Sequence, residues 1–189
     1  SIWPKRLPRA LVVPDTTLWF NLEVSARRYP RKAAYQFFGQ ELSYAALHEQ
    51  ARAIAGWLHS VGVQPGDRVA LFMQNCPQFA AACYGVWCAN AVLVPVNPMN
   101  RADEFKHYIS DPQTHVVICS ADLAGIVHAA NDSLPEAERA RHVLVARYVD
   151  ALPPGGIASV DAPSAAVEQW LRSDPPLPAN SHASSIYWA

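Results

Sequence analysis

The chain has 189 residues, of which 51% are hydrophobic and 16% are charged, and its formal net charge is −1. This length and composition favour one compact domain with a substantial core. A net charge near zero, without basic or acidic runs, argues against binding to nucleic acid or to an anionic membrane surface. The N-terminal stretch "SIWPKRLPRALVVPD" carries charges and prolines where a secretory signal needs an apolar helix.

The N-terminal part predicts a helix followed by a hairpin. The apolar spacing favours a first helix over Thr16–Tyr29, capped by Asp15 or Thr16. The short runs "AAYQFF" and "ELS" follow, and the pair Gly39-Gln40 between them suits a tight turn. We therefore expect a small antiparallel β-hairpin here.

A second helix follows the hairpin. Ser43 is placed to cap it, its apolar face extends to about Ser60, and Gly62 is suited to the left-handed backbone that ends a helix. The chain then changes character, because "RVALFM" is a continuous apolar run of the kind found in parallel strands that are covered on both faces.

From this point strands and helices are expected to alternate. The predicted strands are "RVALFM", "AVLVPV", "HVVICS" and "RHVLVA". Three helices are predicted between them: the first starts at Asn75 with Pro77 and runs to Ala89, and the second starts at Asn100, with Asp103 completing a capping box. The third spans about Asp122–Ala130. This order predicts an α/β fold with a mostly parallel, doubly wound sheet flanked by helices.

One segment within this alternation imitates a membrane span. From Val69 to Asn100 there is no Asp, Glu, Lys or Arg, and Phe79–Val96 is long enough to resemble a transmembrane helix. Prolines and amide side chains interrupt the segment on both sides, so we interpret it as a buried strand, helix and strand. We expect no transmembrane segment.

Composition changes after residue 150. Residues 151–178 contain six prolines, which indicates a mainly extended connector with one short helix near Ala165–Leu171. The final "SSIYWA" looks like the start of a further element. We therefore divide the chain into an α/β subdomain, residues 1–150, and a Pro-rich connector, residues 151–189.

Catalytic and metal-binding signatures are absent from the sequence. The four cysteines lack CxxC spacing, the seven histidines lack HxxxH or HExxH spacing, and GxGxxG, GxxxxGK[ST] and GxSxG do not occur. We interpret the cysteines as reduced, buried thiols. No residue is assigned a catalytic or metal-binding role.

Two joints between a strand and a helix are candidates for a binding site. In open parallel sheets, ligands bind beyond the carboxyl ends of strands, near helix N-termini. The joints are Gln74-Asn75-Cys76-Pro77 and Asn97-Pro98-Met99-Asn100-Arg101, and the second ends in an arginine suited to a phosphate or nucleotide. Ordinary turn chemistry also explains these residue types.

Several motifs taken together resemble the N-terminal part of the adenylate-forming, AMP-binding superfamily. Leu42–Leu47 is similar to its first core motif and Trp87–Pro98 to its second; "GVQPGDRVAL", "NCPQF" and "VPVNP" occur at matching separations. The resemblance covers about residues 16–125, and the start at Trp3 resembles long-chain fatty acid ligases. Ala46 and Asn90 stand where the family usually has an acidic residue and glycine, but both substitutions preserve the helix and its end.

The resemblance implies a larger enzyme. The family's Ser/Thr/Gly-rich phosphate loop and its lysine would begin where Tyr187-Trp188-Ala189 ends the sequence, and the later magnesium, ribose and C-terminal lysine motifs are also missing. We therefore expect an N-terminal fragment of the acyl-CoA synthetase fold, inactive alone and ending at a subdomain edge.

For the complete protein, the resemblance implies an acid–thiol ligase that converts a long-chain fatty acid to acyl-adenylate and then to acyl-CoA. ATP, CoA and Mg²⁺ are its expected cofactors, and Asn97, Pro98, Met99, Asn100 and Arg101 its expected CoA-contact loop. Expected partners are the rest of the chain and the fatty acid, with a homodimer left open and no nucleic acid. The expected location is cytoplasmic, with membrane contact through the lipid substrate. A truncated binding or interaction module, an aryl-CoA ligase and an acyl-AMP ligase remain alternatives.

Overall fold

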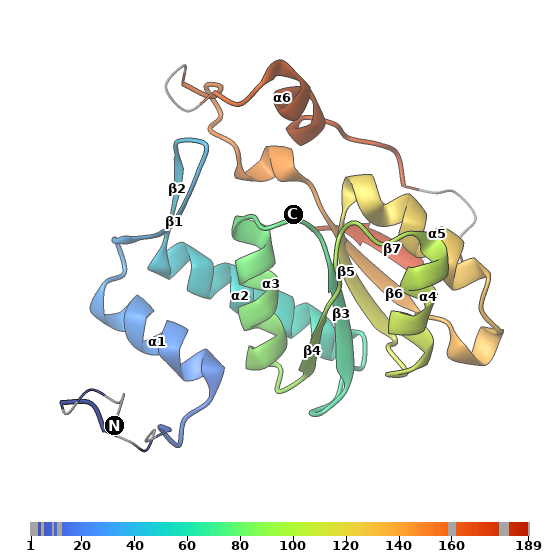
Figure 1. Ribbon diagram of the computed structural model, residues 1–189, viewed down its shortest axis with the longest axis horizontal. Helices are drawn as coiled ribbons and strands as arrows, with labels where there is room; N and C mark the ends of the chain where they lie inside the picture. Colours follow the sequence, from blue (N-terminus) through green and yellow to red (C-terminus); the bar gives the residue numbers. More distant parts are fainter. Residues whose placement is uncertain are drawn as a thin grey trace.

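The protein is a three-layer α/β structure in which helices cover both faces of a parallel sheet (Figure 1). The computed structural model describes residues 4, 6–8, 10, 13–158, 162–177 and 182–188. Trp3 and Ala189, named above for the family resemblance, lie outside the described residues. The two halves of the core lie between the sheet and α2 with α3, and between the sheet and α4 with α5.

The helices and strands follow one another as the sequence predicts. The helices are α1 (Leu18–Arg28), α2 (Tyr44–Ser60), α3 (Pro77–Cys88), α4 (Ala102–Ser110), α5 (Ala124–Asp132) and α6 (Ala165–Leu171). Short 3₁₀ turns are η1 (Ala121–Leu123), η2 (Glu136–Glu138) and η3 (Tyr148–Ala151). The strands are β1 (Ala33–Phe37), β2 (Gln40–Ser43), β3 (Arg68–Phe72), β4 (Val92–Pro95), β5 (Val116–Ser120), β6 (His142–Ala146) and β7 (Ser184–Tyr187).

The main sheet is parallel, with strand order β4-β3-β5-β6-β7. The chain moves from β3 outward to β4, then crosses back to β5 and continues in the other direction. This reversal between β3 and β5 is the topological switch point of a doubly wound fold. The predicted fold class is confirmed, and β1 and β2 form the predicted separate antiparallel hairpin.

Alternate residues of each central strand enter opposite halves of the core. Leu71 and Ile118 pack with the α2 and α3 side, whereas Phe72 and Cys119 pack with the α4 and α5 side. On the latter side the ring centroids of Phe72 and Phe105 are 4.5 Å apart. Because both faces are covered, the strands are apolar runs rather than alternating patterns.

Two predictions near the N-terminus are wrong by one or two residues. The hairpin turn is Phe38-Gly39, not Gly39-Gln40, because both turn residues have positive φ (46° and 83°) and Gln40 already pairs with Phe37. A two-residue turn of this kind needs left-handed backbone at both positions. The first helix starts at Leu18, and its cap is Thr17, whose Oγ1 accepts from Phe20 N at 3.2 Å.

The predicted starts of two later helices also shift by one residue. Cys76, rather than Asn75, caps α3, and its Sγ accepts from Phe79 N at 3.4 Å. The N-cap of α4 is Arg101, one residue after the predicted Asn100, and Glu104, not Asp103, accepts from its backbone N–H at 2.8 Å. In both cases several polar residues adjoin the helix start, and the backbone geometry selects one.

The charge-free segment contains a strand, a helix and a strand as predicted, but β4 is not buried. It is an edge strand, and its Val92 side chain is 48% exposed. The helix predicted from Asp122 begins one residue earlier, as the 3₁₀ turn η1 that leads into α5. Among the described residues, every helix falls short of the length and apolarity that a bilayer crossing requires.

Helices α2 and α3 approach each other closely at Gly85. A Cβ atom added to Gly85 would lie 2.7 Å from the Ile54 Cβ and Cγ2 atoms and 3.1 Å from the Ala51 carbonyl oxygen. Gly56, on the exposed side of α2, has no atom within 4 Å of its added Cβ. Close packing of the two helices therefore requires glycine at position 85, whereas no neighbouring atom requires it at position 56.

We predict that Gly85→Ala destabilises the chain by about 1–3 kcal/mol, because the added methyl group overpacks the helix contact. The matched variant Gly56→Ala is expected to stabilise it by about 0.5–1 kcal/mol, since alanine favours an exposed helix interior. Urea unfolding of the 189-residue chain measures both. A neutral or stabilising Gly85→Ala would contradict the close contact.

Edge strand β7 is tied to α5 through a buried imidazole. His128 is 3% exposed, its Nε2 lies 3.0 Å from the Ser185 hydroxyl, and its buried Nδ1 has no hydrogen-bond partner among the described residues. Burial lowers the pKa of His128, and the nearby Asp132 opposes this shift. Asp132 itself is paired with His182 at 2.9 Å.

We predict a loss of stability as the pH falls below about 6.5, the ordinary His value. Because the pKa of folded His128 is lower than that, the unfolded chain binds the proton first and is favoured. His128→Gln should flatten the decrease in unfolding free energy between pH 7.5 and pH 5.5. If the unfolding free energy of the unmodified chain and of His128→Gln depends equally on pH, the pKa of His128 is the same in the folded and unfolded states, which would contradict the prediction.

Candidate nucleotide-binding edge

All five strands of the main sheet run in one direction, so their carboxyl ends meet along one edge. We call this the carboxyl edge. Both joints identified from the sequence lie there: Gln74–Pro77 follows β3, and Asn97–Arg101 follows β4. In doubly wound folds this is the edge at which ligands bind.

At the switch point, aromatic side chains fill much of the space beyond β3 and β5. The Gln74 backbone N–H donates to the Tyr148 hydroxyl at 3.0 Å, and the Tyr148 and Trp170 ring centroids are 4.6 Å apart. Trp170 Nε1 donates to Asp122 at 2.9 Å. Burial raises the pKa of Tyr148, which keeps its hydroxyl neutral. Helix α6 thus closes over the switch point.

A cavity of about 460 Å³ remains beside this aromatic cluster. It is lined by Phe37, Phe38, Gln74, Asn75, Tyr148, Trp170 and Leu171. It therefore lies between the hairpin, the joint after β3, and α6.

The loop Asn97–Arg101 has the geometry of an ordered turn at the end of an edge strand. Asn97 Oδ1 accepts from Met99 N at 3.0 Å, and the Asn97 carbonyl accepts from Asn100 N at 3.0 Å. Met99 is 77% exposed. The backbone hydrogen bonds thus organise the loop internally, while its side chains remain accessible.

Arg101 is the cationic group of this loop. It is exposed, and no ion pair to its guanidinium occurs among the described residues. An adjacent cavity of about 530 Å³ is lined by Asn100, Glu104, His107, Tyr108, Asp111 and Pro112. An exposed, unpaired arginine at a helix N-terminus can bind an anionic group.

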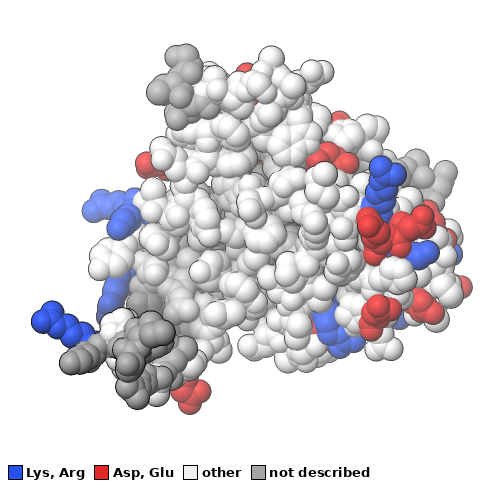
Figure 2. Space-filling view, viewed as in Figure 1, with Lys and Arg blue, Asp and Glu red and all other residues white. Residues whose placement is uncertain are grey.

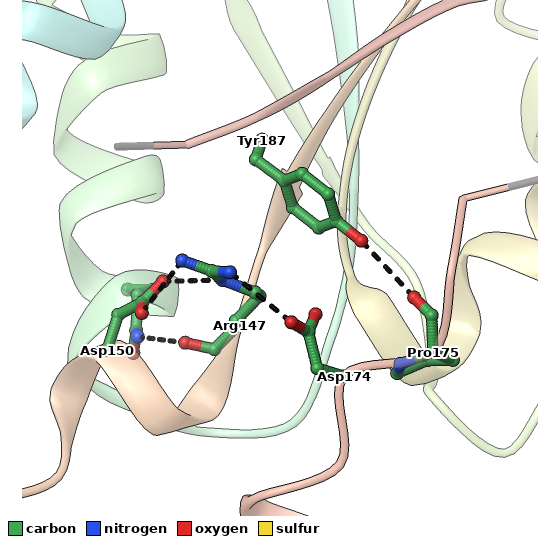
Figure 3. A network of polar contacts seen from close by, with 6 residues as sticks. Arg147, Asp150, Asp174, Pro175 and Tyr187 are labelled. Carbon is green, nitrogen blue, oxygen red and sulfur yellow. Dashed lines mark hydrogen bonds and ion pairs between the residues drawn. The ribbon is translucent and has the colours of Figure 1, made fainter.

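At the other end of the carboxyl edge, a polar network joins the ends of β6 and β7 (Figure 3). Arg147 binds both oxygens of Asp150 at 3.1 and 3.2 Å and one oxygen of Asp174 at 3.4 Å. Its guanidinium carbon lies 5.1 Å from the Tyr187 ring centroid, and the Tyr187 hydroxyl donates to the Pro175 carbonyl at 3.2 Å.

A second cavity of about 460 Å³ lies beside this network. Its lining includes Gln78 at the start of α3, Arg147, Asp150 and Trp188. Gln78 Nε2 donates to the Arg147 carbonyl at 2.9 Å, so α3 is also connected to the end of β6. The end of β7 therefore lies beside a hollow with both polar and aromatic walls.

These two regions of the carboxyl edge are far apart. Strands β4 and β7 are the opposite edges of the sheet, separated by four strand spacings. At about 4.8 Å per spacing, the loop after β4 and the end of β7 are roughly 19 Å apart. The structure does not bring Asn97–Arg101 together with the Arg147 network.

The centre of one face of the molecule shows no charged side chains (Figure 2), and we call this central area the uncharged face. Figure 2 shows charged side chains around the periphery, whereas the centre of this view, over α3, has none. A groove of about 450 Å³ on α3 is lined by Tyr35, Asn75, Cys76, Phe79, Ala80, Cys83, Tyr84 and Trp87. Aromatic enrichment and charge depletion are features of the central part of protein interfaces.

Two thiols of this region, Cys76 and Cys83, are buried. Burial raises the pKa of Cys76 to about 11 and that of Cys83 to about 12, so both stay protonated near neutral pH. All four cysteines are free; Cys76, Cys83 and Cys119 are buried as expected, whereas Cys88 is half-buried. No group of three His, Cys, Asp or Glu side chains suited to a metal ion occurs in the part of the chain that the structure describes.

The sequence located the two strand–helix joints but missed the Arg147 network. Arg147 directly follows the buried run "HVLVA", so its place at a strand end was a usable signal. Its partners were not predictable, since Asp174 and Tyr187 are far along the chain, beyond the Pro-rich stretch.

Comparison with known proteins identifies the family. The model of the AMP-binding enzyme family matches residues 22–187, which is most of the chain. A long-chain-fatty-acid–CoA ligase of Bacillus subtilis is 36% identical over 116 residues, 61% of this chain and 21% of the ligase. One of Yersinia pestis is 32% identical over 158 residues, 80% of this chain and 27% of the ligase. The chain thus spans about a quarter of the length of these relatives.

The fold agrees with this family. The N-terminal domain of FACL13 from Mycobacterium tuberculosis superimposes with a TM-score of 0.64 at 27% identity, covering 87% of this chain and 37% of that domain. Its match includes the same architecture of a parallel sheet flanked by helices. The protein therefore belongs to the family of AMP-binding enzymes, the adenylate-forming ligases, and has the fold of their N-terminal region.

Proposed function

We propose that this chain is the N-terminal portion of an ATP-dependent, AMP-forming ligase that activates a long-chain fatty acid as acyl-adenylate and transfers the acyl group to CoA. The observation that carries the proposal is the family match over residues 22–187 together with relatives named as long-chain-fatty-acid–CoA ligases. The relatives' greater length supports the view that other parts of the protein complete the site.

The chain supplies the scaffold rather than the chemistry. Adenylation develops charge on phosphate groups, so it needs preorganised donors, a lysine and magnesium. The carboxyl edge holds Arg101 and Arg147, but Arg147 is already paired with Asp150 and Asp174. ATP and Mg²⁺ would therefore be bound mainly by residues beyond this chain, and we expect the 189-residue chain to be inactive.

The remainder of the protein is the proposed partner of the uncharged face. The groove on α3 and the half-exposed β4 present aromatic and aliphatic side chains where a stable monomer would present charges. Residues 1–150 are then an α/β subdomain, and residues 151–189 connect it to the following part. A cytoplasmic enzyme that reaches the membrane only through its lipid substrate fits this proposal.

The proposal is tested with protein made from the complete native coding region. We expect fatty-acid-dependent conversion of ATP to AMP and pyrophosphate, with acyl-CoA formed when CoA is added. The matched control is the 189-residue chain, which should form neither product. Acyl-AMP without acyl-CoA would indicate an acyl-AMP ligase, turnover of aromatic acids alone would indicate an aryl-CoA ligase, and no turnover of any acid would favour a binding or interaction module.

We further propose that Asn97–Arg101 contacts the nucleotide part of CoA in the complete enzyme. Its exposed side chains and the unpaired Arg101 support this role.

Arg101→Ala in the complete enzyme is expected to raise the KM for CoA about fivefold to tenfold, the loss of about one charge-assisted hydrogen bond. The rate of acyl-AMP formation should not change. Arg141→Ala is the matched control, because Arg141 is exposed and precedes β6, at the amino end of the strands and away from the carboxyl edge. An unchanged KM for CoA in Arg101→Ala would refute the contact.

A further inference from the structure

Positive charge is concentrated in the N-terminal part of the chain. Residues 1–32 contain seven Lys and Arg residues and two Asp and Glu residues, whereas residues 33–189 contain eight and fourteen. Figure 2 shows Lys and Arg side chains at the margin where α1 lies in Figure 1, and Asp and Glu side chains gathered toward the opposite margin. The net charge of −1 conceals this separation, so it does not exclude an anionic partner for the basic part.

The most basic stretch is residues 27–32, "RRYPRK", which we call the basic turn. It places four cations within six residues at the end of α1, and all six residues are exposed. Backbone hydrogen bonds fix its shape. Lys32 N donates to the Tyr29 carbonyl at 3.1 Å, and the Pro30 carbonyl accepts from Ala45 N at 3.0 Å, at the start of α2. The cations are thus displayed on an ordered turn.

Contacts within the chain do not account for these charges. Arg27 is paired with Glu23 at 2.8 Å. No ion pair to Arg28, Arg31 or Lys32 occurs in the part of the chain that the structure describes. Arg27 and Arg28 lie in the last turn of α1, where cations complement the helix dipole. Arg31 and Lys32 lie beyond the helix, so neither explanation applies to them.

Aromatic side chains are exposed beside the basic turn. Phe20 is 44% exposed and Tyr29 is 57% exposed. Phe20, Val24 and Arg28 are spaced four residues apart on α1, so they form one row along the helix surface. The core contact of the helix is made from its other side, by the buried Leu22. The exposed side of α1 therefore combines cations with apolar surface.

An anionic lipid surface matches this combination. Its headgroups attract cations, and each Lys or Arg near the surface strengthens binding about fivefold. Its acyl boundary accepts apolar side chains, and a tyrosine ring is favourable at the level of the headgroups. Nucleic acid would also attract the cations, but it offers no apolar interior for Phe20.

We propose that the basic turn and the row Phe20, Val24 and Arg28 form a docking surface for a bilayer that contains anionic lipids. This surface would hold the protein at the membrane through charge and shallow apolar insertion. The inference goes beyond the proposed function, under which the enzyme reaches the membrane only through its lipid substrate. Vesicle binding tests it without any measurement of turnover.

The test is co-sedimentation of the complete protein with phosphatidylcholine vesicles that either contain or lack phosphatidylglycerol. We expect the vesicles with phosphatidylglycerol to bind about tenfold or more tightly, and the difference to shrink at 1 M salt, where charges are screened beyond about 3 Å. Arg28→Gln/Arg31→Gln should weaken binding to these vesicles about 25-fold, since each charge contributes about fivefold. Arg28→Lys/Arg31→Lys should retain the affinity, because it keeps both charges.

The matched control is Arg141→Gln/Arg172→Gln. It removes the same charge from two exposed positions away from α1, one before β6 and one after α6. It should bind within about twofold of the unmodified protein, because screening limits the effect of distant charges. Phe20→Ser should weaken binding about fivefold, and this loss should persist at 1 M salt, since it reflects apolar insertion.

Three results would overturn the inference. Equal binding to both kinds of vesicle would show that headgroup charge is not recognised. Equal losses in Arg28→Gln/Arg31→Gln and in the control would show that the position of the charges has no effect. Tighter binding to duplex DNA than to the phosphatidylglycerol vesicles, lost in the same double variant, would assign the surface to nucleic acid. A complete protein that binds these vesicles but forms no acyl-AMP would refute the proposed function and support this inference.

Discussion

The common direction of the five strands is the constraint on which the rest of the structure depends. Parallel strands must be connected by crossovers, which here place α3 on one face and α4 and α5 on the other. The same direction brings every strand's carboxyl end to one edge. Core and candidate site are therefore two consequences of one topology: the apolar strand interiors build the first, and the residues just beyond each strand build the second.

The buried strands and several helix ends could be predicted from the sequence because they follow from local residue patterns. The continuous apolar runs of β3, β5 and β6, the Ser43 cap with its 3.2 Å bond to Ala46 N, and the left-handed Gly62 and Asn90 were all predictable. Errors arose where several residues could fill one role. Thr17, Cys76 and Arg101 each took a cap predicted for a neighbour, and the exposure of β4 depends on strand order, which no local pattern encodes.

The candidate site was less predictable than the fold, for a physical reason. The loop Asn97–Arg101 is a local turn, so its residues could be named from the chain itself. The Arg147 network is assembled from residues 147, 150, 174 and 187, which meet only because β7 pairs with β6 after the connector has crossed the carboxyl edge. Such contacts follow from the complete topology. They also involve exposed charges, which carry little of the patterning that reveals a core.

The most direct test of the proposed function is the intact mass of the natural protein, combined with the sequence of its coding region beyond residue 189. If this chain is the N-terminal portion of a fatty acyl-CoA ligase, the coding region continues for several hundred residues, as the share of the relatives that it spans implies. A Ser/Thr/Gly-rich loop with a lysine should follow β7 directly. A natural protein whose mass corresponds to these 189 residues alone would contradict the ligase proposal and favour a binding or interaction module.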